Sequence, residues 1–142
     1  DPLEGGTAAL LYTQEFYAIA KSRLNSGGVL VTQSGPAGLL NYTECFTTIF
    51  KTLGTIFAYT TAVQVHIPAF QTLWGFTIAS DNPFPEGSEK DVDDQVTDRL
   101  SSALRYYDGV SHRNLLALPK FQRDGLKSED RINRDSDPVF ML

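Results

Sequence analysis

Apolar positions in the first part of the chain recur with the spacing of helices. Residues 12–24 carry an apolar side chain at every fourth position, which predicts a helix with one buried face. Residues 42–53 place apolar side chains at i, i+3, i+4 and i+7 and predict a second helix. Asn41 and Glu44 have capping-box spacing, so we expect this helix to begin beside them and to end at Gly54.

Three further runs have the composition of strands. Residues 29–33 read Val-Leu-Val-Thr-Gln and are apolar on both faces, which is typical of a central parallel strand, and a loop is expected at 34–38. Residues 56–67 are rich in β-branched and aromatic side chains, and Pro68 ends them. Residues 74–79 form another such run, which can pair with the preceding strand as an antiparallel hairpin.

The order helix, strand, helix, strand, strand predicts an α/β fold and matches the closing part of an open sheet. No strand pattern precedes the helix at 12–24, because residues 1–9 have the composition of a loop. We therefore expect this region to be the second half of a sheet.

The pattern changes after residue 80. Residues 1–80 hold four acidic and three basic side chains, whereas residues 81–142 hold thirteen acidic and nine basic ones. We interpret 1–80 as a buried sheet layer and 81–142 as a charged C-terminal extension. In the extension, an apolar stripe predicts a helix at 90–104, one or two helical turns are expected at 121–127, and the apolar end is expected to dock.

Composition excludes several classes of protein. The formal charge of −5 disfavours nucleic acid and anionic lipid as partners, and no apolar run approaches the roughly 18 residues of a membrane helix. A single cysteine, Cys45, forms no internal disulfide and fits a reducing compartment, so we expect a cytoplasmic protein. With two histidines 46 positions apart, we expect no metal site.

A few polar and aromatic side chains are candidates for binding an amine. Asp1 and Glu4 lie in a Gly-rich loop, where their carboxylates could hold an ammonium group; exposed loop residues are the commoner explanation. Gln33 is expected at the carboxyl end of its strand, where α/β sheets bind ligands. Phe70 and Trp74 flank a turn and could line an amine by cation–π attraction, although burial in a core is the more frequent use of aromatic side chains.

Several segments together resemble one enzyme family. They are DPLEGG at 1–6, LYT and FY within 11–17, LNSGG at 24–28, VTQSGPA at 31–37, VHIPAF at 65–70, WGF at 74–76, LRYYDG at 104–109 and LPK at 118–120. These motifs are similar to those of the aminopropyltransferases of polyamine synthesis. They resemble the thermospermine synthase branch more than ordinary spermidine synthases.

The resemblance implies a fold and a reaction. The expected fold is the C-terminal half of a Rossmann-like sheet of the S-adenosylmethionine-dependent methyltransferase type, ending in an antiparallel hairpin. The expected reaction moves a 3-aminopropyl group from decarboxylated S-adenosylmethionine to an amine and releases 5′-methylthioadenosine. Decarboxylated S-adenosylmethionine is then a co-substrate, and no tightly bound cofactor is expected.

The resemblance also assigns roles to residues. Asp1 matches the second, polyamine-binding aspartate of a two-aspartate motif, whose proton-accepting first aspartate would lie upstream. Gln33 matches a polyamine-contacting glutamine, and Trp74 is expected among the substrate-binding residues. Phe70 stands where spermidine synthases commonly have a substrate-contacting tyrosine, so the hydroxyl is missing here. The loop containing Gly6, Thr7 and Leu11 matches the wall beside the donor.

The implied partner is a polyamine such as putrescine or spermidine, and the full-length family forms homodimers or homotetramers. We expect the chain alone to be inactive, because the donor site and the first aspartate would lie upstream. Two alternatives stay open: a non-catalytic assembly or regulatory protein of the same lineage, and a methyltransferase-fold domain with other chemistry.

Overall fold

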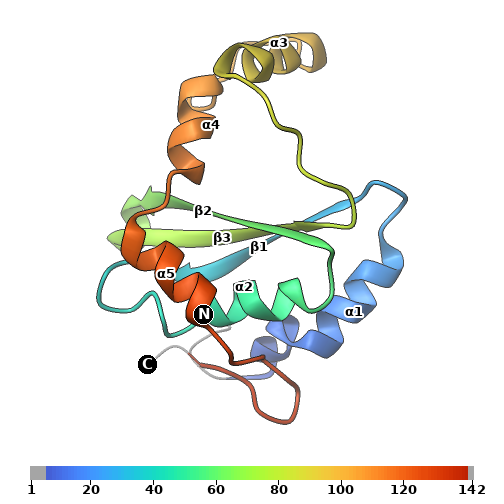
Figure 1. Cartoon of the computed structure of the whole chain (residues 1–142), viewed down its shortest axis with the longest axis vertical. Helices are drawn as coiled ribbons and strands as arrows, with labels where there is room; N and C mark the ends of the chain where they lie inside the picture. The colour runs from blue at the N-terminus through green and yellow to red at the C-terminus, as the bar shows by residue number, and fades with distance from the viewer. Residues whose placement is uncertain (1–5, 141–142) are drawn as a thin grey trace.

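Three antiparallel strands form the centre of the molecule. The structure, a computed structural model, describes residues 6–140, with the side chain of Thr7 left out. The strands are β1 (Val29–Pro36), β2 (Tyr59–Ile67) and β3 (Thr72–Ser80), in the spatial order β1-β3-β2 (Figure 1). The β2–β3 hairpin is confirmed. The prediction of a central parallel strand at 29–33 is wrong for the described residues. Among them, β1 pairs only with β3 and is antiparallel to it.

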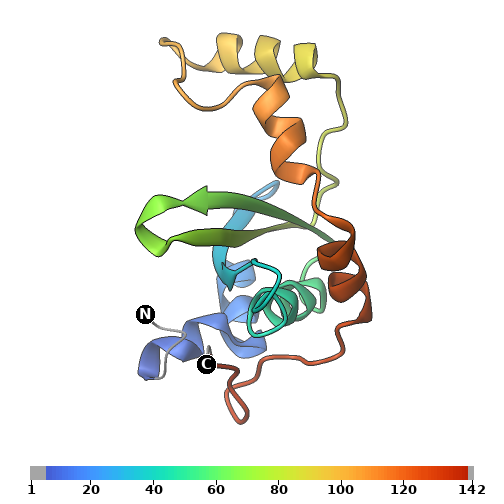
Figure 2. The same ribbon diagram turned by 90° about the vertical axis from the view of Figure 1, so that its left-hand side faces the viewer.

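Helices cover one face of this sheet. They are α1 (Gln14–Arg23) and α2 (Phe46–Gly54), which lie below the sheet in Figures 1 and 2, and α5 (Lys120–Ser128), which runs down from the level of the sheet and contacts α2. One core cluster joins Tyr17 to Ile49, Leu53 and Ala79, and a second joins Phe46 and Ala62 to Leu118. The fold is therefore α/β, with a two-layer core between sheet and helices.

The first helix is shorter than its apolar pattern predicts. A 3-10 helix, η2 (Thr7–Tyr12), occupies part of the expected loop, and α1 starts only after Thr13. Thr13 ends η2 and caps α1, because its hydroxyl accepts a hydrogen bond from the Phe16 amide at 3.3 Å. Tyr12, the first residue of the expected helix, thus belongs to η2.

The second helix begins differently from its predicted capping box. Asn41 and Glu44 lie in a turn before α2, and the N-cap residue is Cys45, whose side chain makes no capping hydrogen bond. The capping-box prediction is therefore wrong. A carboxylate from far along the sequence lies at this helix terminus instead.

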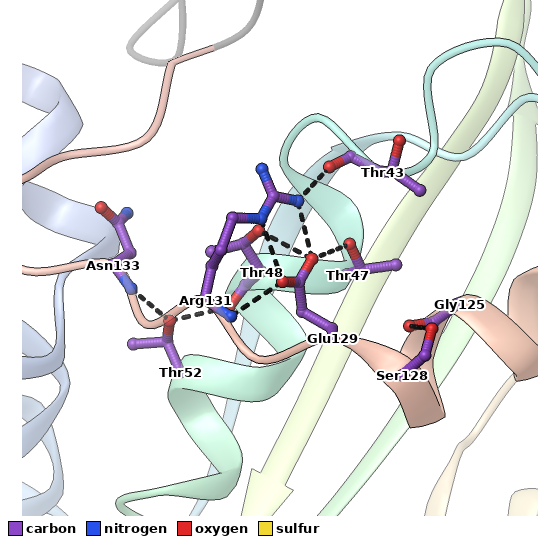
Figure 3. A network of polar contacts seen from close by, with 9 residues as sticks. All are labelled: Thr43, Thr47, Thr48, Thr52, Gly125, Ser128, Glu129, Arg131 and Asn133. Atoms are coloured by element: carbon purple, nitrogen blue, oxygen red, sulfur yellow. Dashed lines mark hydrogen bonds and ion pairs between the residues drawn. The ribbon is translucent and has the colours of Figure 1, made fainter.

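That carboxylate is Glu129, whose side chain is 7% exposed (Figure 3). Its Oε2 accepts hydrogen bonds from the hydroxyls of Thr47 at 2.6 Å and Thr48 at 3.2 Å, both in the first turn of α2. Arg131 donates to Glu129 through Nε at 3.0 Å and Nη2 at 2.7 Å, and Nη2 also donates to the Thr43 carbonyl. A negative charge beside a helix N-terminus is favourable, so this pair fixes the chain after α5 to the start of α2.

Asn133 extends the same attachment to the opposite end of the chain. Its backbone N–H donates to the Thr52 hydroxyl at 2.9 Å, and its carbonyl accepts from the Gln14 amide at 2.8 Å. Its side chain donates to the Tyr12 carbonyl at 3.0 Å and accepts from the Val139 amide at 2.8 Å. Val139 packs against the core, which confirms the docking of the apolar end for this residue. Phe140 is 41% exposed, and Met141 and Leu142 lie outside the described residues.

The sheet and α2 approach closely at Gly75. A Cβ atom added at Gly75 would overlap the ring of Phe46, which is fully buried. Gly75 is paired with Gly35 across β1 and β3. The absence of two side chains here lets α2 lie directly on the sheet.

Two helices lie on the other side of the sheet from this helical layer, and one of them contacts β2. They are α3 (Glu89–Arg99) and α4 (Gly109–Leu116), which form an arm at the top of both views. The expected helix at 90–104 therefore ends five residues early, and α4 was not predicted. No helix in the described part of the chain is long and apolar enough to cross a membrane.

Acidification tests the Glu129 attachment. Burial raises the pKa of Glu129, but hydrogen bonds from Arg131 and Thr47 outweigh it and lower the pKa to about 2. A lowered pKa gives stability that is complete above the unfolded value of 4.5 and is lost as pH falls toward 2. We expect Glu129→Gln to lower the free energy of unfolding at pH 7 by about 3 kcal/mol and to flatten its pH dependence below 4.5. Urea unfolding at several pH values measures both.

The exposed Glu86 provides the control for this experiment. Glu86→Gln should leave the free energy of unfolding within about 0.5 kcal/mol of the wild type. Equal effects of the two substitutions would show that the buried ion pair does not hold the C-terminal segment.

A pair of glycine substitutions tests the contact between α2 and the sheet. Gly75→Ala forces the Phe46 ring to move and should cost about 1–3 kcal/mol of unfolding free energy. Gly54→Ala is the matched control, because its Cβ would meet only the Thr60 hydroxyl at 3.7 Å, and alanine favours the helix. Thermal unfolding of both variants compares them; equal melting temperatures would contradict the close approach.

Candidate functional site

A β-bulge reshapes β1 near its carboxyl end. The register with β3 shifts between Gln33 and Gly35, and Gly35 adopts a φ of 87°, which glycine tolerates without strain. The strand continues to Pro36, so the expected loop at 34–38 is wrong in its first residues. Gln33 lies three residues before the end of β1, and its side chain is exposed.

Gln33, Phe70 and Trp74 form a cluster beside this bulge. The indole Nε1–H of Trp74 donates a hydrogen bond to Gln33 Oε1 at 3.1 Å. Phe70 comes from η3 (Pro68–Phe70) at the turn between β2 and β3, and its ring centroid lies 4.4 Å from that of Trp74. Trp74 is 4% exposed, whereas Phe70 is 44% exposed. The structure thus brings Gln33 together with the aromatic pair Phe70 and Trp74, which the sequence nominated apart from it.

The hydrogen bond from Trp74 restricts what Gln33 can offer to a ligand. An indole N–H can only donate, so it holds the oxygen of the Gln33 amide toward Trp74. That oxygen has a second lone pair, which can accept from an ammonium or amine N–H. The exposed Phe70 ring adds an apolar and π-rich surface next to it. The cluster can therefore bind an amine attached to an aliphatic chain.

The residues expected along the donor lie on a different element. Gly6 adopts a φ of 131° just before η2, and Leu11 within η2 is 51% exposed. Thr7 begins η2, and its side chain is outside the described part of the structure. η2 is attached to the C-terminal segment through the Tyr12 carbonyl and Asn133. The expected amine-binding carboxylates, Asp1 and Glu4, lie outside the described residues.

A clamp that the sequence did not suggest fixes the chain after β1. The Gln122 side chain, fully buried in α5, donates through Nε2 to the Ala37 carbonyl at 2.5 Å and to Gln64 Oε1 at 2.6 Å. Ala37 follows β1 directly, so the clamp holds the end of the strand that carries Gln33. A glutamine in a charged helix gives no sequence signal of burial, because such residues are normally solvated.

Other reactive groups are poorly placed for chemistry. Burial and the neighbouring Glu44 carboxylate raise the pKa of the Cys45 thiol to about 11, which keeps it protonated. Within residues 6–140 as described, no three His, Cys, Asp or Glu side chains are grouped to hold a metal ion.

Curated relatives match this chain almost from end to end. It is 36% identical to the polyamine aminopropyltransferase of Sulfolobus acidocaldarius over 141 residues, covering 98% of this chain and 46% of that protein. It is 34% identical to the thermospermine synthase ACAULIS5 of Arabidopsis thaliana over 142 residues, covering 99% of this chain and 42% of that protein. The chain thus spans less than half the length of these relatives.

Solved structures show the same fold. A spermidine synthase in complex with the transition-state analogue AdoDATO matches with a TM-score of 0.68 at 23% identity, over 84% of this chain and 39% of that one. The spermidine synthase of Thermotoga maritima matches with a TM-score of 0.67 at 23% identity, over 84% of this chain and 40% of that one. The three-stranded sheet and its helices therefore have the arrangement found in spermidine synthases.

A family model settles the assignment that the residues and the fold suggest. The model of the spermine/spermidine synthase domain matches residues 1–91, which include β1, the hairpin and the whole Gln33–Phe70–Trp74 cluster. Together with the relatives, this match shows that the chain belongs to the spermine/spermidine synthase family.

Proposed function

We propose that this chain supplies the acceptor-amine part of a polyamine aminopropyltransferase. The observation that carries the proposal is the Gln33–Phe70–Trp74 cluster, in which a fixed amide oxygen lies beside an exposed aromatic ring. Family membership supports the reaction class, and the names of the relatives point to polyamines as substrates.

The chemistry of a polyamine matches this cluster. Its ammonium groups are hydrogen-bond donors, which the free lone pair of Gln33 Oε1 can accept. Its methylene segments are apolar and can lie along Phe70, with cation–π attraction where an ammonium passes over the ring. Phe70 has no hydroxyl, so the aromatic wall contributes contact and not a hydrogen bond. Asp1 is the proposed carboxylate partner of a second ammonium.

In the proposed reaction, the acceptor nitrogen attacks the propyl carbon next to the sulfonium of decarboxylated S-adenosylmethionine. A C–N bond forms, the C–S bond breaks with its electrons going to sulfur, and one proton leaves the nitrogen. The attacking nitrogen must be neutral, so a base must hold the proton. Gln33 cannot serve as this base, since an amide oxygen is too weakly basic, and its part is to orient the amine.

We further propose that the base is an aspartate preceding Asp1 in the longer protein and that Gly6, Thr7 and Leu11 line the donor. On this basis the chain alone binds an amine and does not transfer the aminopropyl group.

The single tryptophan gives a direct test of amine binding. We expect spermidine to change the Trp74 fluorescence saturably, and Gln33→Ala to weaken binding about 10-fold or more, because a hydrogen bond to a charged group contributes about 1.5–3 kcal/mol. Gln95→Ala, an exposed glutamine on α3, is the matched control and should bind as the wild type does. No saturable response at millimolar spermidine, or equal loss in both variants, would overturn the proposed acceptor site.

Calorimetry with 5′-methylthioadenosine tests the division between acceptor and donor sites. The chain should show no binding heat, because η2 offers only one wall of the expected donor site. A micromolar affinity for 5′-methylthioadenosine would contradict the proposal that the chain lacks the donor site. The acceptor site is tested separately, by the spermidine titration.

A further inference from the structure

The side-chain amide of Gln122 connects the two outer strands of the sheet. Its Nε2 donates to the carbonyl of Ala37, directly after β1, and to Oε1 of Gln64 in β2. The strand order is β1-β3-β2, so these two hydrogen bonds together span β3. Gln64 is paired with Gly75 of β3, and Gly75 is paired with Gly35 of β1. One buried amide therefore holds β1 and β2 at a fixed distance from each other at this row of the sheet.

The Gln33–Phe70–Trp74 cluster is built on the same three strands, beside this row. Gln33 precedes Gly35 by two residues in β1, and Trp74 directly precedes Gly75 in β3. The hydrogen bond from Trp74 to Gln33 joins β3 to β1, and Phe70 lies against Trp74 from the turn between β2 and β3. The geometry of the cluster thus depends on how β1 lies relative to the hairpin, which is the relation that the Gln122 amide fixes.

α5 is firmly held in the place where it presents this amide. The ring of Phe121 packs edge-on against the ring of Tyr42, with the ring centroids 5.1 Å apart. A Cβ atom at Gly125 would overlap the same Tyr42 ring, so α5 lies directly on the segment that follows β1. The Tyr42 amide in turn donates to the Gly38 carbonyl at 3.0 Å. α5 and the loop after Ala37 therefore form one packed unit.

Stability alone does not account for a glutamine at position 122. The side chain is fully buried, and its own Oε1 has no hydrogen-bond partner within the described part of the chain. A buried polar atom without a partner costs free energy, and a methionine would fill a similar volume without that cost. A methionine could not donate to Ala37 and Gln64. What the glutamine supplies is the connection between the outer strands.

We propose that Gln122 is a positioning residue for the acceptor amine. Its amide holds β1 and the β2–β3 hairpin at the separation at which Gln33 Oε1 and the Phe70 ring contact the same ligand. This inference rests on the proposed acceptor site. It gives the charged C-terminal extension a part in amine binding, although none of the three cluster residues belongs to that extension.

Solvent exchange of the Trp74 indole N–H tests this role in the free chain. Trp74 is the one tryptophan, so its indole signal is unambiguous in nitrogen-15 NMR. We expect Gln122→Met to speed this exchange about 10-fold, because the hydrogen bond to Gln33 opens more often once β1 is released. Gln64→Met removes one of the two connecting hydrogen bonds and should speed it about 3-fold.

A spermidine titration measures the consequence for the ligand. Gln122→Met should raise the dissociation constant about 5- to 10-fold, because the free chain no longer holds the binding geometry. Asn133→Ala is the matched control, since Asn133 is a second fully buried amide of the extension, and its side chain bonds to Tyr12 and Val139. This control should also lower the melting temperature, but it should change the indole exchange and the dissociation constant by less than about 2-fold.

Circular dichroism checks that each variant folds. If Gln122→Met does not fold, the half-buried Gln64→Met carries the same test. An unchanged indole exchange, an equal change in Asn133→Ala, or a faster exchange with an unaltered dissociation constant each overturns the positioning role. If the wild type does not bind spermidine, the proposed acceptor site fails, and the exchange in the free chain still decides whether Gln122 positions the cluster.

Discussion

The arrangement of this chain depends on one buried carboxylate. Glu129 lies at the start of α2, between the hydroxyls of Thr47 and Thr48 and the guanidinium of Arg131. An ionised carboxylate in a buried position is costly unless it is paired and hydrogen-bonded, and here both conditions are met. Through it, a segment from the far end of the sequence becomes part of the layer that covers the sheet (Figure 3).

A series of contacts runs from this carboxylate to the amine-binding cluster. α2 begins at Phe46, whose ring lies against Gly75 in β3. Trp74 precedes Gly75, so its side chain points to the opposite face of the sheet, where its indole holds Gln33. The contact of α2 with Gly75 thus fixes the position of β3, the strand that carries Trp74. Gln122 fixes the end of β1 in the same layer, so both strands of the site have their backbone held from below.

The parts of the fold that the sequence predicts are those with local causes. The β2–β3 hairpin follows from two β-rich runs around Pro68, and the one or two helical turns expected at 121–127 lie within α5. The start of α2 could not be predicted from local sequence. The carboxylate at its first turn belongs to Glu129, which is 82 positions from its hydrogen-bond partner Thr47. α4 was missed because eight residues with Gly109 at the start carry little helical periodicity. The predicted helix at 90–104 is longer than α3. Leu100 and Leu104 continue the apolar stripe of Val92 and Val96, but they lie on the exposed segment after α3.

For the site, the sequence predicts which residues take part but not how they are arranged. Gln33, Phe70 and Trp74 could be nominated from the sequence, but the contact of Gln33 with Trp74 joins two strands, β1 and β3, whose antiparallel pairing the sequence did not predict. The most direct measurement of the central claim is the indole N–H signal of the one tryptophan in a nitrogen-15 NMR spectrum, recorded during a titration with spermidine. The account predicts a saturable shift in the wild type, none with sodium chloride at equal ionic strength, and a lost response in Gln33→Ala. A signal that is unmoved by spermidine, or that moves equally without the Gln33 amide, would contradict it.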